Sequence, residues 1–70
     1  MSATATLNGT DRELAEGTTV ADLIASLGHD PRGRGVAAAI NGEVVPRTSW
    51  GATIVSDGDR VEVLTAIGGG

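Results

Sequence analysis

The 70-residue sequence predicts a two-layer α+β domain, in which one helix packs on a mixed sheet of four or five strands. Asn8-Gly9 and Asn41-Gly42 each stand between short strand-like runs, and Asn-Gly is the strongest short hairpin signal. Between them, apolar residues recur at helical spacing, and residues 60–67 read as a final strand. The predicted order is therefore hairpin, helix, hairpin, strand.

The N-terminal half contains the first hairpin and the helix. Residues 4–7 and 12–15 are the expected strands on either side of Asn8-Gly9. Thr19 and Asp22 have capping-box spacing, which predicts a helix start, and Gly28 is placed to end the helix as a left-handed cap. One apolar stripe follows the helix: Val20, Leu23, Ile24 and Leu27.

The C-terminal half contains the second hairpin and the last strand. Composition predicts a loop over 29–35, a hairpin of 36–40 with 43–46, a turn or short helical segment over 47–50, an extended segment over 52–55 and a tight turn at 57–59. In the β-grasp arrangement of these elements, the last strand lies in the middle of the sheet beside the first. Residues 1–67 then form the domain, and 68–70 form a flexible glycine tail.

Alternation along the last strand predicts which of its side chains are available to a partner. If Val61 and Val63 face the helix, the residues between them face the open side of the sheet. The neighbouring strand adds alanines to the same side. The candidate partner surface comprises Ala37, Ala39, Glu62, Leu64 and Ala66 on this face, together with Arg47.

Composition excludes several classes of function. The net charge of −4 without a basic run argues against nucleic acid as a partner and favours an electropositive protein surface. The chain has no cysteine, no lysine and one histidine, so an independent enzyme is the least expected class. His29 reads as a solvated loop residue, and Asp57 and Asp59 read as turn residues rather than metal ligands. We expect a cytoplasmic protein with no metal and no membrane segment.

The three glycines Gly68, Gly69 and Gly70 suit entry into another protein. Without a Cβ, they can pass through a slot too narrow for other residues. The alternative is an ordinary chain end with no role.

Several short motifs together resemble the ThiS family of bacterial thiamine-biosynthesis sulfur carriers. They are Ala39-Ile40-Asn41-Gly42, Val45-Pro46-Arg47, Trp50, Asp57-Gly58-Asp59 and the closing Gly69-Gly70. The resemblance covers residues 7–70 and departs from the family at Gly68, where another residue is usual. It implies a ubiquitin-like β-grasp fold and a carrier role for Gly70.

The resemblance also implies a set of partner enzymes. A ThiF-type adenylyltransferase would use ATP and magnesium to adenylate the Gly70 carboxylate. Sulfur from a cysteine desulfurase relay would convert it to a thiocarboxylate, which would donate sulfur to thiazole synthase. The chain itself would bind no cofactor and would not be an enzyme.

Two other functions remain open on the sequence. One is the small sulfur-carrier subunit of molybdopterin synthase, which would differ mainly in the acceptor enzyme. The other is a β-grasp binding module without covalent chemistry, in which the tail has no role. Arg47 either pairs with an acidic group of a partner or is an ordinary exposed arginine.

Overall fold

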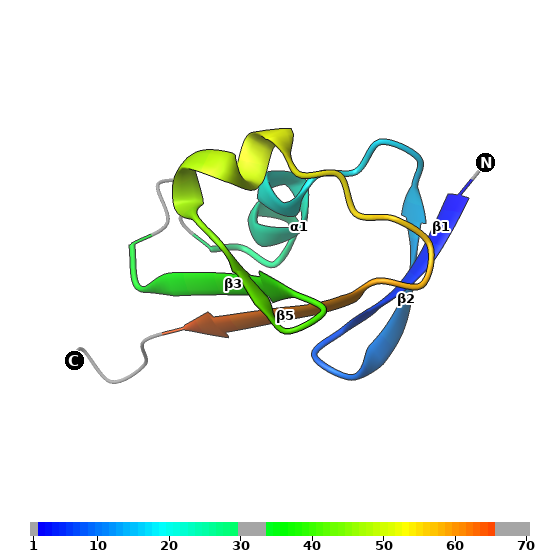
Figure 1. Ribbon diagram of the computed structural model, residues 1–70, viewed down its shortest axis with the longest axis horizontal. Helices are drawn as coiled ribbons and strands as arrows, with labels where there is room; N and C mark the ends of the chain where they lie inside the picture. The colour runs from blue at the N-terminus through cyan, green and yellow to red at the C-terminus, as the bar shows by residue number, and fades with distance from the viewer. Residues whose placement is uncertain (1, 30–33, 66–70) are drawn as a thin grey trace.

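The computed structural model describes residues 2–29 and 34–65, which form two layers. Figure 1 shows the sheet on one side and α1 with the 3-10 helix η1 on the other. The elements of the described residues are β1 (Ser2–Leu7), β2 (Thr10–Ala15), α1 (Val20–Ser26), β3 (Val36–Ile40), β4 (Glu43–Val45), η1 (Arg47–Ala52) and β5 (Arg60–Thr65). The predicted α+β class and the ubiquitin-like β-grasp arrangement are confirmed.

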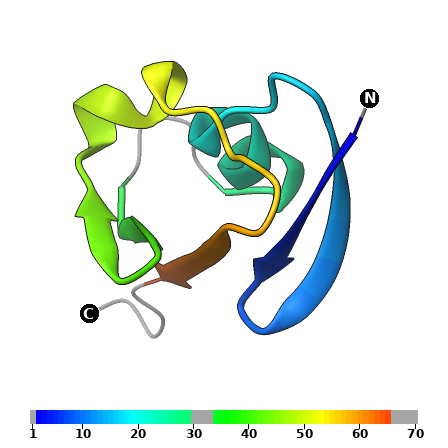
Figure 2. The same cartoon turned by 45° about the vertical axis from the view of Figure 1, so that its right-hand side comes forward.

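The five described strands form one sheet in the order β2-β1-β5-β3-β4. β5 is parallel to β1 and antiparallel to β3, so the last strand occupies the centre as the sequence predicts. In Figure 2 the chain leaves β5 between the two hairpins, on the edge of the molecule away from the N-terminus. The end of β5 at Thr65, the last residue described before the glycine tail, therefore lies in the middle of the sheet.

Both Asn-Gly pairs form two-residue hairpin turns. Leu7 lies opposite Thr10, and Ile40 lies opposite Glu43. Asn8 has a φ of 50° and Asn41 a φ of 52°, and the glycine after each is also at positive φ. This is the left-handed backbone that a tight hairpin turn requires and that Asn-Gly adopts at low cost.

The helix begins and ends as its sequence predicts. The Thr19 hydroxyl accepts a hydrogen bond from the Asp22 amide at 3.1 Å, and the Asp22 carboxylate accepts one from the Thr19 amide at 3.0 Å. At the other end, Gly28 has a φ of 82° and donates its amide to Ala25, while His29 donates to Ile24. These two bonds form a Schellman cap.

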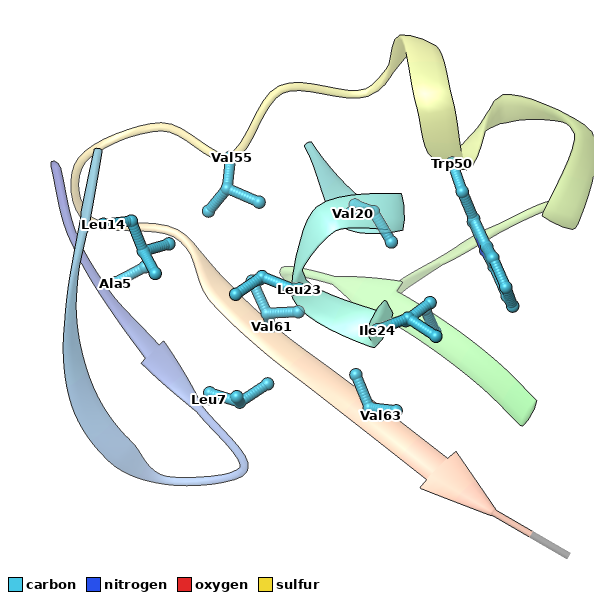
Figure 3. Packing of buried hydrophobic residues seen from close by; sticks show 11 residues of the cluster. Ala5, Leu7, Leu14, Val20, Leu23, Ile24, Trp50, Val55, Val61 and Val63 are labelled. Carbon is cyan, nitrogen blue, oxygen red and sulfur yellow. The ribbon is translucent and has the colours of Figure 1, made fainter. Parts of the chain in front are cut away.

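The core lies between α1 and the sheet and is closed at one end by Trp50 (Figure 3). Its Nε1 donates to the Val45 carbonyl at 2.9 Å, so the indole ties η1 to β4 while its ring fills the core. The side chains are small because no Phe or Tyr is present in the sequence. The buried members are Ala5, Leu7, Leu14, Val20, Leu23, Ile24, Ala38, Trp50, Val55, Val61 and Val63.

The segment expected to be extended over 52–55 differs in part. Ala52 ends η1, and the extended chain from Thr53 onward does not join the sheet. It pairs instead with the first residue of α1 and the chain just before it: Val20 donates to the Thr53 carbonyl, and Val55 donates to the Thr18 carbonyl, each at 2.9 Å. The predicted continuation of β5 through residues 66 and 67 lies outside the described residues.

Candidate partner surface and the base of the C-terminal tail

Side chains of β5 alternate between the core and the open face of the sheet. Val61 is fully buried and Val63 nearly so, whereas Glu62 and Leu64 are exposed. Leu64 is 68% exposed, which is high for a leucine in a central strand. The predicted orientation of β5 is thus confirmed for the four of these residues that the structure describes.

Pairing with β3 places small side chains beside Leu64. Ala37 lies opposite Leu64, and Ala39 lies opposite Glu62. Because alanine fills little space, a shallow hollow of about 140 Å³ opens here. Its lining comprises Ala37, Ala38, Ala39, Gly42, Val44, Glu62 and Leu64.

Val44 belongs to this surface and was not among the predicted site residues. It lies opposite Ala39 on β4 and is 76% exposed. The position of Val44 could have been predicted from the two-residue turn at Asn41-Gly42. Such a turn pairs Ile40 with Glu43 and therefore places Val44 beside Ala39. We call Ala37, Ala39, Val44, Glu62 and Leu64 together the Leu64 patch.

Other predicted site residues do not join the Leu64 patch. Arg47 is exposed at the start of η1, which packs against α1 on the opposite side of the sheet, and it does not line the hollow. Ala66, Gly68, Gly69 and Gly70 lie outside the described residues.

A second hollow, of about 430 Å³, lies between β4, η1 and the segment before β5. Val44 lines it as well as the first, and Ile54, which is 57% exposed, lines it too. Within 2–29 and 34–65, no three His, Cys, Asp or Glu residues gather closely enough to hold a metal ion. In those same ranges no helix has the length and apolar character needed to cross a membrane.

Asparagine side chains from the two hairpins hold both ends of β5. The Asn41 Oδ1 accepts from the Arg60 amide at 2.9 Å, and its Nδ2 donates to Asp59 at 3.1 Å. At the outgoing end, the Asn8 Oδ1 accepts from the Val63 amide at 2.8 Å, and its Nδ2 donates to the Val63 carbonyl at 3.1 Å. The sequence identifies both asparagines as turn residues but does not show that their side chains bind the last strand.

The geometry is that of a small domain with an apolar surface beside the end of its central strand. The chain is 43% identical over 58 residues to the sulfur carrier protein ThiS of Escherichia coli, covering 83% of this chain and 85% of that protein. It is also 41% identical over 64 residues to a thiazole synthase of Paramagnetospirillum magneticum, covering 91% of this chain but only 19% of that relative's length.

Solved structures agree with the fold. The crystal structure of the thiamine biosynthesis protein ThiS from Geobacter metallireducens has a TM-score of 0.76 and 38% identity, covering 96% of this chain and 99% of that one. A solution structure of a thiamine biosynthesis protein from the same organism gives a TM-score of 0.77 at 38% identity, covering 96% of this chain and 87% of that one. The ThiS family model matches residues 5–70, which include all five described strands in whole or in part, the Leu64 patch and the three final glycines. With the central β5 and its neighbouring patch in place, this match shows that the chain belongs to the ThiS family of thiamine-biosynthesis sulfur carriers.

Proposed function

We propose that this chain carries sulfur for thiazole formation on the carboxylate of Gly70. A partner adenylyltransferase of the ThiF type joins that carboxylate to AMP from ATP, releasing pyrophosphate. A sulfur nucleophile then displaces AMP and leaves a thiocarboxylate. The thiocarboxylate donates its sulfur to thiazole synthase.

The observation that carries this proposal is that the family match extends through Gly70. A match confined to the folded body would fit a binding module equally well. Because it includes the glycines, the tail belongs to what the family shares, which favours a carrier over a module whose tail has no role.

The chemistry explains why so small a domain suffices. A carboxylate is a poor electrophile, so it must first become a mixed anhydride with a good leaving group. ATP, magnesium and the groups that stabilise the transition state belong to the adenylyltransferase. The carrier contributes an accessible carboxylate and a surface by which each partner recognises it.

The names of the relatives favour thiazole synthase as acceptor over molybdopterin synthase. A segment similar to this chain occurs within a longer protein named thiazole synthase, and a second such protein, from Magnetococcus marinus, is 39% identical over 64 residues, again 19% of its length. We infer that carrier and acceptor act together, and that the Leu64 patch contacts the adenylyltransferase, thiazole synthase or each in turn. The sulfur would reach the carrier through a cysteine desulfurase relay.

The intact mass of the protein tests this function. The chain is incubated with ATP, magnesium, sulfide and a ThiF-type adenylyltransferase, and its mass is compared with that of a variant lacking Gly70. We expect a gain equal to the difference between sulfur and oxygen, dependent on ATP and absent from the shortened variant.

A second step identifies the acceptor. Loaded protein is mixed in turn with thiazole synthase and with the large subunit of molybdopterin synthase, each supplied with the co-substrates that accept the sulfur, and loss of the added mass is followed. Loss only with the molybdopterin enzyme would contradict the proposed acceptor. No loading by an adenylyltransferase that loads the Escherichia coli carrier would contradict the carrier function itself.

A further inference from the structure

Asn8 makes three hydrogen bonds to β5, although it lies 55 positions away from Val63 in the sequence. Its backbone amide donates to the Val61 carbonyl at 2.9 Å. Its side chain then bonds both the amide and the carbonyl of Val63, at 2.8 and 3.1 Å. The side-chain amide of Asn8 therefore bonds β5 in the manner of one further peptide unit of β1.

The bonds from the Asn8 side-chain amide support a part of β5 that the backbone of β1 does not reach, because β1 ends before β5 does. In the described residues, the parallel ladder pairs Thr6 with Arg60 and Leu7 with Val61, after which β1 turns into the hairpin. Backbone bonds from β1 thus stop at Val61. The Asn8 side chain extends the support by two residues, or about 7 Å along the strand, toward the point where the chain leaves the sheet.

Two independent features of position 8 favour asparagine over other residues. The turn places Asn8 at a φ of 50°, which asparagine and glycine tolerate better than other residues. Binding the amide and the carbonyl of one residue together requires an acceptor atom and a separate donor atom on a short side chain, which the asparagine amide has. Aspartate would fit the turn but would place a carboxylate oxygen against the Val63 carbonyl.

Asn41 provides an internal comparison. It occupies the same turn position, has nearly the same φ of 52° and is also followed by glycine. Its side chain, however, bonds the Arg60 amide, at the incoming end of β5. The two asparagines are chemically equivalent and act on opposite ends of one strand.

We propose that Asn8 is a positioning residue that fixes the outgoing end of β5 and thereby presents the tail that follows to the adenylyltransferase. This inference rests on the carrier function proposed above. Without the Asn8 side chain, the amide and carbonyl of Val63 lose these bonds, and the part of β5 after Val61 is held in the sheet only by its pairing with β3. Additional residues must then be ordered when the tail enters the partner, which raises the cost of productive binding.

Hydrogen exchange measures the first part of the proposal without any partner. Asn8→Gly keeps the turn backbone and removes the amide, and Asn41→Gly is its matched control. We expect exchange of the Val63 amide to rise about tenfold in Asn8→Gly relative to Asn41→Gly. Equal Val63 exchange in the two variants would overturn the proposal, whatever the protein carries.

Adenylation kinetics measure the second part, with pyrophosphate release as the readout at a temperature where all variants are folded. Ordering one more residue on binding corresponds to a rise in KM for the carrier of about 5-fold to 30-fold with kcat nearly unchanged. We expect this rise for Asn8→Gly and Asn8→Asp but not for Asn41→Gly. A merely structural role would affect both glycine variants alike, or affect neither.

The outcomes separate this inference from the proposed function. If the wild-type chain is not adenylated by an enzyme that adenylates the Escherichia coli carrier, the function fails, and Val63 exchange alone decides whether Asn8 fixes the end of β5. If the wild type is adenylated but Asn8→Gly has the KM of Asn41→Gly, the positioning role is wrong while the carrier function stands.

Discussion

Thr19 and Asp22 join the first turn of α1 to the chain that precedes it. Each side chain accepts a hydrogen bond from the other residue's backbone amide. α1 has only seven residues, too few for a helix to form alone in water, so its cap and its packing must supply its stability. At the scale of single residues, this reciprocal pair is therefore a large contribution for a domain expected to have about 3–5 kcal/mol in total.

Replacing the cap tests that estimate. Thr19→Ala removes the hydroxyl that accepts from the Asp22 amide, and we expect the free energy of unfolding to fall by about 0.5–2 kcal/mol. Urea denaturation measures the change. Thr19→Ser retains a hydroxyl and should lose less than Thr19→Ala, whereas equal losses would show that the Thr19 methyl group, and not the cap, is what matters.

At the scale of elements, β5 is the central strand of the sheet, and its two faces differ: one packs in the core and the other is exposed. Val61 is fully buried against α1, whereas Leu64 on the same strand faces away from the core. Alternation in the sequence predicts this division because strand side chains point to opposite faces in turn. The same strand thus contributes both to the core and to the open face of the sheet, where we propose that partners bind.

A pair of alanine substitutions compares how much each face of β5 contributes to the free energy of unfolding. Val61→Ala removes two buried carbon atoms and leaves a small cavity, so we expect about 2–3 kcal/mol of destabilisation, a large part of the total. Leu64→Ala, on the exposed face, should change the free energy of unfolding by less than about 0.5 kcal/mol. Thermal and urea unfolding of both variants provide the measurement, and comparable losses would mean that Leu64 packs in solution.

Local signals explain why so much of the fold is predictable. The turns at Asn8-Gly9 and Asn41-Gly42, the capping box and the apolar stripe each depend on residues within seven positions of one another. The path of residues 53–55 is harder to predict from the sequence. It depends on hydrogen bonds that Thr53 and Val55 form with residues at, and just before, the start of α1. The bonds from Asn8 to Val63 depend on the completed β-grasp topology, and no local pattern reveals them.

At the scale of the whole molecule, exposed apolar side chains lie on two different surfaces. Leu64 belongs to the patch on the open face of the sheet, and Ile54 lines the other hollow. Both are aliphatic and similarly exposed, at 68% and 57%, so exposure alone does not say which of them a partner covers. Position favours Leu64, because it lies on β5, one residue before the last described residue of that strand.

Placing a charge at each position decides between the two surfaces. Leu64→Arg should weaken binding to the adenylyltransferase or thiazole synthase by about 30-fold or more, as loss of an apolar anchor at the centre of an interface does. Ile54→Arg should change the affinity by less than about twofold, since rim and non-interface positions contribute little. Calorimetric titration of each variant into each partner measures both effects, after circular dichroism has shown that both variants are folded. If Ile54→Arg weakens binding and Leu64→Arg does not, partners contact the second hollow, between β4 and η1, and the Leu64 patch is not the binding surface.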